Sequence, residues 1–207
     1  MGHSQTHDDL NTPLEYQSEI GRLNIVGFWI FLGAEIALFS TLFATYFALF
    51  NQTADGPVPG DLFQVKGVLI MTFLLLVSSF TSGIAVHELR RRNVKGVFIW
   101  TIITLLLGLG FVGYEVYEFI EYVHEGATLQ TSAFWSGFFV LAGTHGLHVS
   151  IGIAWITLIL IQVKKRGLNS RNATKLFISS LYWHFLDVIW IFIFTGVYLM
   201  GMVLYNG

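Results

Sequence analysis

Five long apolar runs limit what this chain can fold into. Each exceeds about 20 residues, the length at which an α-helix crosses the hydrocarbon core of a bilayer. Strands of a membrane barrel are shorter, about 10 residues, and alternate in polarity, which these runs do not. We therefore predict an all-α, polytopic membrane protein, a bundle of five transmembrane helices in a single domain (24–207) that follows a polar tail (1–23). The predicted spans are residues 24–50, 66–87, 96–117, 133–163 and 176–203.

Composition excludes several classes of protein. Of 207 residues, 54% are hydrophobic and only 12% are charged, whereas about 25% are charged in soluble domains. A net charge of −2 argues against nucleic-acid binding, which needs a basic surface. The chain has no cysteine, which removes disulfides, iron–sulfur clusters and cysteine-bound zinc. The tail lacks the basic start and cleavage site of a signal peptide, so we expect the first run to be a retained helix.

The basic residues predict an orientation. Ten of the 11 Lys and Arg residues fall on one side of the five-span topology, and Lys66 alone falls on the other. Cytoplasmic loops of membrane proteins carry the excess of Lys and Arg. We therefore expect the N-terminus in the cytoplasm and the C-terminus outside.

Five polar residues within the runs are the candidate site. Glu35 lies about 16 Å into the first span at 1.5 Å per residue. The pairs His145 and His148, and His184 and Asp187, are each spaced i,i+3, so each pair shares a helix face. Ionisable groups in hydrocarbon are costly and therefore mark function or structure. Depth arithmetic places Glu35, His148, His184 and Asp187 in a similar layer, so we expect a buried polar network.

Three interpretations of that layer remain open from the residues alone. Paired histidines on facing helices could ligate haem b, as in a membrane electron carrier. The carboxyl groups could form the path of a proton-coupled transporter. The residues could also simply form hydrogen bonds that fix helix packing, which is favoured because a neutral, bonded carboxyl is the cheaper state in low dielectric. The Glu-x-x-His pairs of a di-metal bundle are absent, and we predict no metal site.

Equal depth in two different spans predicts one specific contact, between Glu35 and His148. Glu35 has no basic partner in its own span, and His148 lies at its level on the fourth span. A neutral imidazole nitrogen can accept the proton of a carboxyl, or the two can share it as an ion pair. The alternative is that Glu35 faces another chain or a bound lipid.

An acidic stripe follows the third run. Its members are spaced by three, three and four residues, which puts them on one helical face. We expect the third helix to extend past the membrane with this stripe as its outer acidic face, either simply solvated or serving as a cation or docking site. The residues are Glu115, Glu118, Glu121 and Glu125.

Three segments on three different spans carry a resemblance. They are FWIFLGAE (28–35), FFVLAGTHGLHV (138–149) and YWHFLDVIWIF (182–192). Together, and in this order, they resemble subunit III of the haem–copper terminal oxidases. Glu118 and Tyr122 fall in a weaker match to the same family. The segment EYQSEIGRLNI (15–25) is similar to the quinol-oxidising aa3 branch of Gram-positive bacteria.

The resemblance implies a function and a set of partners. In that family, haem and copper reside in subunits I and II, and subunit III has no catalytic centre of its own. It supports subunit I, binds structural phospholipid and sustains turnover and proton uptake. The resemblance thus implies a non-catalytic subunit of a proton-pumping oxidase in the bacterial cell membrane, with electrons from quinol and with subunits I, II and a small subunit IV as partners. The rival functions remain a haem b electron carrier and a proton-coupled transporter.

The chain also departs from the family pattern. The fuller family form has seven helices, and this chain lacks the first two, as short bacterial versions do. The family's lipid cleft lies between that pair and the other five, so another chain would complete it here. A basic residue that holds lipid phosphate in some relatives falls at Gln162, which leaves Lys164 and Lys165 as candidate headgroup ligands.

Overall fold

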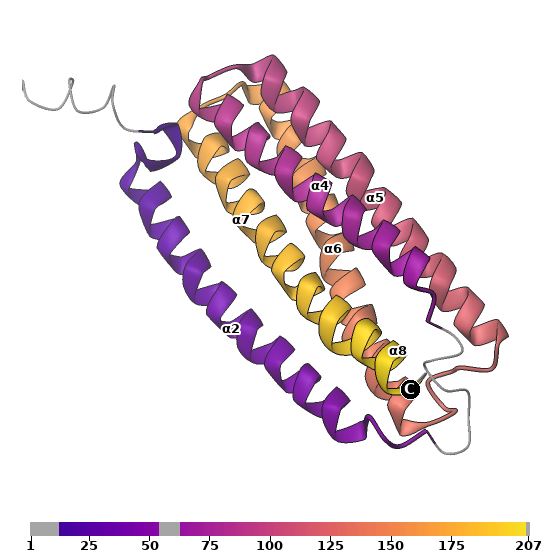
Figure 1. Cartoon of the computed structure of the whole chain (residues 1–207). Helices are drawn as coiled ribbons and strands as arrows, with labels where there is room; N and C mark the ends of the chain where they lie inside the picture. Colours follow the sequence, from indigo (N-terminus) through magenta and orange to yellow (C-terminus); the bar gives the residue numbers. More distant parts are fainter. Residues whose placement is uncertain (1–12, 54–62, 206–207) are drawn as a thin grey trace, which may run out of the picture.

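The computed structural model describes residues 13–53 and 63–205. Five long helices run the length of the molecule and alternate in direction (Figure 1). Each is long and apolar enough to cross a membrane, as predicted. They are α2 (Glu19–Leu49), α4 (Val65–Arg90), α5 (Val94–His124), α6 (Ala133–Arg166) and α7 (Ser170–Ile193); a π-helix, η2 (Phe194–Leu199), and a last turn, α8 (Met200–Tyr205), continue α7, and a short 3-10 helix, η1 (Leu14–Tyr16), precedes α2.

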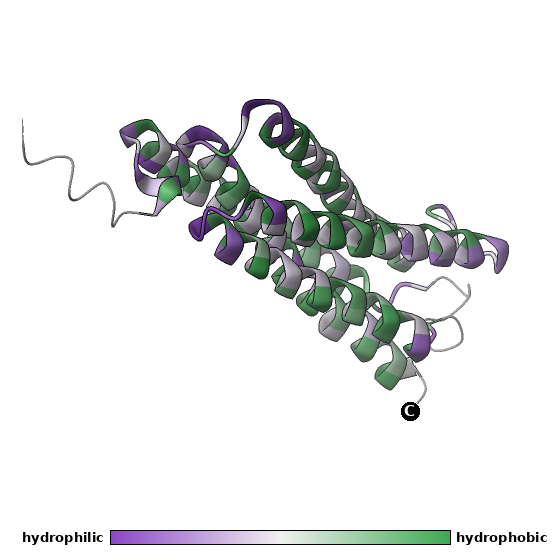
Figure 2. Cartoon of the chain, turned by 90° about the horizontal axis from the view of Figure 1, so that it is seen from above, coloured by the Kyte–Doolittle hydropathy of each residue, from purple (hydrophilic) through white to green (hydrophobic). Residues whose placement is uncertain are grey.

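Capping residues make the helices longer than the apolar runs. Ser18, Asn93, Ser132 and Asn169 each accept a hydrogen bond from a backbone N–H in the first turn of the helix that follows, as N-caps do. As a result α2 begins at Glu19 and α7 at Ser170, ahead of the apolar runs that start at 24 and 176. Helix α5 extends past its apolar run to His124, as expected from the acidic stripe. The apolar runs thus mark the hydrophobic parts of these helices, and the helices extend beyond them into polar segments. Figure 2 shows polar residues gathered at the helix ends and apolar ones along their length.

Helix α7 is the centre of the bundle. It packs against α2, α4 and α6, while α5 packs against α4 and α6; Figure 1 shows α7 in front of α6, between α2 and α4. Two buried indoles fasten it to α4, because Trp183 donates to Ser78 Oγ and Trp190 to Thr72 Oγ, each at 3.0 Å. A tryptophan side chain is readily buried in a core when its indole N–H has a hydrogen-bond acceptor.

The N-terminal segment differs from the predicted polar tail. Residues 14–16 lie against α7 rather than free: Ser170 Oγ donates to the Leu14 carbonyl, and Thr174 Oγ1 to that of Glu15. The Glu15 side chain is fully buried and bonds Arg90 Nε of α4 at 2.9 Å. Helix α2 begins at Glu19, within the segment assigned to the polar tail. Residues 1–12 lie outside the described part of the chain.

The last span is not one regular α-helix. Residues 194–199 form a π-helix within the span, which continues as helix to Tyr205. Thr195 Oγ1 donates to the carbonyl of Ile191, and Gly196 lies against the Phe47 ring of α2. Wide turns of this kind are usually short insertions in an α-helix, and this one brings α7 close to α2.

Candidate functional site

Glu35 and His148 are in contact at mid-membrane depth. His148 Nε2 lies 3.1 Å from Glu35 Oε2, and the two side chains are 17% and 12% exposed. Helix α2 supplies the carboxyl and α6 the imidazole, which also packs on the Phe39 ring at 5.3 Å. This is the contact that the matching depths predicted. Among the described residues, that carboxyl oxygen has no further hydrogen-bond partner.

The second ring nitrogen of His148 fixes how the pair can bond. Nδ1 lies 2.7 Å from the Thr144 carbonyl oxygen, one turn earlier in α6. A carbonyl only accepts hydrogen bonds, so Nδ1 must carry a proton. In the neutral imidazole Nε2 is then an acceptor, which requires the Glu35 carboxyl to donate. If Nε2 is also protonated, the two groups form a buried ion pair.

His145 lies in the core, apart from that pair. Its side chain is fully buried, and Nε2 bonds the Leu186 carbonyl of α7 at 3.1 Å. Phe111 and Trp190 enclose the ring at 5.7 and 5.5 Å between centroids. Nδ1 has no partner among the described residues. This histidine joins α6 to α7 through Nε2, and no described residue forms a metal-ligand set with it.

His184 and Asp187 lie on the outer side of α7. The His184 side chain is exposed, and its Nδ1 is bonded at 2.7 Å to the Ser180 carbonyl in the same helix. Asp187 is half-buried beside Ser79 of α4. The five candidate residues thus form three separate groups rather than the single expected network, because α7 turns its histidine and aspartate away from the face that meets α6.

Two members of the acidic stripe are buried, contrary to the expected outer face. Glu115 and Glu118 are only 3% and 4% exposed. The carboxyl of Glu115 lies directly against Gly146 of α6, and that of Glu118 against Gly67 of α4. Glu121 is partly exposed and Glu125 is exposed. The stripe is therefore a solvated face only at its far end, because neighbouring helices cover the first two residues.

Tyrosines surround the buried carboxyl of Glu118. The hydroxyls of Tyr122 and Tyr198 lie 3.4 and 3.5 Å from Glu118 Oε2, so α5 and η2 meet there. Sequence reasoning missed this cluster because stripe spacing says which face residues share, not what covers that face. Glycines at 67 and 146 were a usable signal, since small residues mark close helix approach in membranes.

The basic end carries the two lysines that were considered for lipid headgroups. Lys164 and Lys165 are exposed at the end of α6. Lys175 Nζ instead reaches back to Gln162 Oε1 at 2.7 Å. It lines a hollow of about 590 Å³ between α2 and the loop from α6 to α7, to which Arg166 and Arg171 also contribute.

No group of three or more His, Cys, Asp or Glu side chains in residues 13–53 and 63–205 is arranged to hold a metal ion. Chemically, the described polar groups can fix helices to one another, hold or exchange a proton, and attract anions at the basic end.

Comparison with known proteins gives one consistent result. The family model described as cytochrome c oxidase subunit III matches residues 20–202. Quinol oxidase subunit 3 of Bacillus subtilis is 73% identical over 202 residues, 98% of each chain. Probable quinol oxidase subunit 3 of Staphylococcus saprophyticus is 57% identical over 197 residues, 94% of this chain and 97% of its own. The corresponding protein of Staphylococcus aureus is 54% identical over 201 residues.

Proposed function

Since this chain belongs to the cytochrome c oxidase subunit III family, we propose that it is the accessory subunit of a terminal oxidase that takes its electrons from quinol. One observation carries the quinol assignment. A relative named quinol oxidase subunit 3 shares 73% of its residues across 98% of both chains. Membership of the terminal-oxidase complex and a multi-pass place in a bacterial membrane follow from the family and the five apolar helices.

In the proposed complex, other chains carry out the redox chemistry. Subunits I and II hold the haem and copper, and a small subunit IV is a further partner. This chain supports the catalytic subunit and binds structural phospholipid. Its described side chains fit that role, since the conspicuous polar groups join helices: Glu35 to His148, and His145 to the Leu186 carbonyl.

The proposal includes an orientation of the chain in the membrane. The N-terminus and the basic end face the cytoplasm, and the end with Lys66 faces outward. The support is the distribution of Lys and Arg.

Anionic lipid at the basic end is also part of the proposal. Lys164 and Lys165 are exposed there, and the hollow beside them adds Arg166, Arg171 and Lys175. Basic clusters at the cytoplasmic surface attract anionic headgroups by about 1 kcal/mol for each Lys or Arg.

Purification in mild detergent tests the function. We expect this chain, carrying an affinity tag, to bring down a haem-containing partner with an a-type absorption spectrum. The complex should oxidise a soluble quinol rapidly and reduced cytochrome c poorly. A dinuclear copper centre in the complex with fast oxidation of cytochrome c would contradict the quinol assignment, and absence of any haem-bearing partner would contradict the accessory role.

A further inference from the structure

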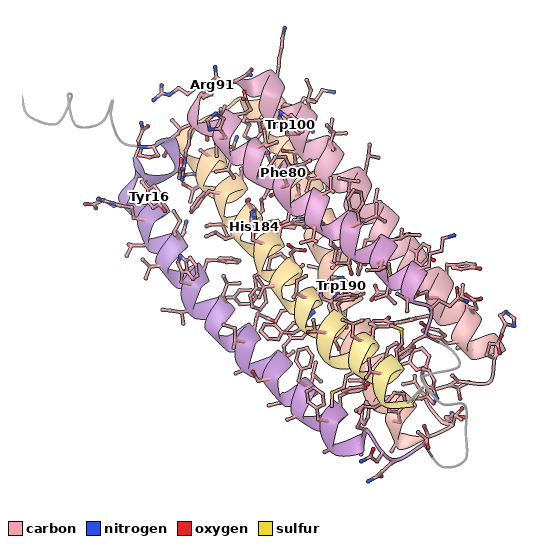
Figure 3. The ribbon with its side chains drawn as sticks, in the orientation of Figure 1. Tyr16, Phe80, Arg91, Trp100, His184 and Trp190 are labelled. Carbon is pink, nitrogen blue, oxygen red and sulfur yellow. The ribbon has the colours of Figure 1, made fainter. Side chains whose placement is uncertain are left out.

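A small cavity lies inside the bundle where α4, α5, α6 and α7 meet. The space open to the centre of a water molecule there is about 10 Å³, about the volume that one water needs. Thr101 of α5 lines the cavity and lies within the apolar run that starts at 96. Figure 3 labels its neighbour Trp100 near the end of the bundle that carries Arg91. The cavity therefore lies at membrane depth, in the half of the bundle closer to the basic end.

Hydroxyl groups dominate the lining of this cavity. None of its lining side chains is charged, and more than half carry a hydroxyl: Ser82 of α4, Thr101 and Thr104 of α5, and Ser179 and Ser180 of α7. Cavities lined only by apolar side chains stay dry, whereas polar ones of sufficient size hold water. An ion would lie here without a countercharge, which is costly away from water. The lining thus fits a small neutral ligand that both donates and accepts hydrogen bonds.

The hydroxyl of Thr101 lacks a partner within the described protein. The residue is only 4% exposed, and its Oγ1 makes no hydrogen bond with any described residue. Hydrocarbon around the bundle offers no hydrogen-bonding groups, and a buried polar group without a partner is costly. Thr101 Oγ1 therefore needs a partner from outside the protein, and the cavity that it lines is the space for one.

The serine hydroxyls of the same cavity leave acceptor sites free. Ser82 Oγ of α4 bonds Ser180 Oγ of α7 at 2.9 Å. Ser179 Oγ donates to a carbonyl of its own helix at 2.9 Å. Because a hydroxyl oxygen has two lone pairs, these oxygens can accept further hydrogen bonds. The lining thus offers one unmet donor and several acceptors, a pattern that a water molecule completes by accepting one hydrogen bond and donating two.

We propose that this cavity binds one ordered water molecule, which accepts a hydrogen bond from Thr101 Oγ1 and donates to serine hydroxyls of α4 and α7. Buried waters typically make about three hydrogen bonds with polar groups that are otherwise unmet. The water joins α5 to α4 and α7 within the membrane, where no side chain of the described residues reaches Thr101 Oγ1. The site is interior to this chain, so it does not depend on the identity of the partner subunits.

A structure of the purified protein at a resolution that shows ordered water tests the site directly. We expect one peak in the cavity, about 2.5–3.0 Å from Thr101 Oγ1, the range for hydrogen bonds between oxygens. A cavity without density, in a map that shows water elsewhere inside the protein, would overturn the proposal. A Thr101 hydroxyl rotated onto the carbonyl of Val97, one turn earlier in α5, would also overturn it.

Removing the hydroxyl gives a second test, whose sign depends on the water. Thr101→Val keeps the shape of the side chain. With water in the cavity, the change removes one of the water's partners and should lower the midpoint of thermal unfolding by about 2–4 °C, the shift expected for one hydrogen bond in a chain of this size. In a dry cavity the same change would remove an unmet buried hydroxyl. An unchanged or higher midpoint would therefore contradict the proposal.

Two further variants separate the water from other effects of the substitution. Thr157→Val is the matched control, because Thr157 is exposed on α6 and its Oγ1 donates to the Ile153 carbonyl of its own helix; the midpoint should change less. Thr101→Ser keeps the hydroxyl and should keep the density peak, whereas Thr101→Val should weaken it. Equal loss of stability in Thr157→Val and Thr101→Val, or an undiminished peak in Thr101→Val, would refute the hydrogen bond.

Discussion

At the scale of single residues, the contact of Glu35 with His148 is the most specific feature of the bundle. Depth in two apolar runs was enough to predict it, because rise per residue is a local property of a helix. The same arithmetic failed for His184 and Asp187. Depth does not say which way a side chain points, and α7 turns these two outward while His145 points into the core.

The Glu35 contact gives a first prediction. Glu35→Ala removes the group that meets His148 Nε2 and should lower the free energy of unfolding by about 1–3 kcal/mol, the cost of an unmet buried polar atom. Glu35→Gln keeps a hydrogen-bond donor and should cost less. Thermal denaturation of the purified complex in detergent measures both. No loss of stability in Glu35→Ala would show that the contact contributes nothing, and equal loss in both variants would show that a neutral donor cannot replace the carboxyl. Haem absorption should be unchanged in both variants.

The contact between Gly146 and Glu115 gives a second prediction. A methyl group at Gly146 would collide with the Glu115 carboxyl, and overpacking of a filled core costs about 1–3 kcal/mol. Gly146→Ala should therefore lower the midpoint of thermal unfolding. Gly113→Ala is the control, because nothing lies within 4 Å of a Cβ built there. A stable Gly146→Ala variant would mean that Glu115 is not held against α6.

At the scale of elements, the five spans were predictable and their ends were not. The length of an apolar run can be counted in the local sequence, and each of the five runs lies in one membrane-spanning helix. The π-helix at 194–199 and the docking of η1 involve contacts between distant segments, such as that of Gly196 with Phe47 and that of Glu15 with Arg90. Local patterns carry no record of such contacts.

Docking of η1 gives a third prediction. Arg90→Ala leaves the buried Glu15 carboxylate without its cation and should detach the N-terminal segment, at a cost on the order of 1–3 kcal/mol. Arg91→Ala is a suitable control, because Arg91 is 68% exposed and 3.8 Å from Glu88, and exposed pairs contribute about 0–1 kcal/mol. Limited proteolysis near residue 18 should be faster in Arg90→Ala alone. Equal rates in the two variants would argue against a structural role for Glu15.

At the scale of the whole molecule, the predicted orientation rests on the unequal distribution of Lys and Arg between the two ends of the bundle. Reporter fusions after Asn93 and Asn169, in the loops at the basic end, should read cytoplasmic because those loops carry most of the Lys and Arg. Fusions after Thr128, and after Asp55, which lies outside the described residues, should read external. The inverse pattern would overturn the orientation while leaving the fold untouched.

The function of the whole molecule was predicted from the motif segments and not from the geometry of the polar layer. The residues of the polar layer left a haem carrier, a transporter and a packing network open, and burial now places them in three separate groups. Three motif segments on three spans suggested the family directly, and the match over residues 20–202 agrees with them.

The central claim is that this chain belongs to an oxidase whose metals lie elsewhere. The most direct test is to purify the complex, separate this chain from it in detergent, and determine iron and copper in each fraction by elemental analysis. The account predicts haem iron and copper with the remaining subunits and none with this chain. Recovery of about one haem iron for each copy of this chain, as a bis-histidine carrier would give, would contradict it.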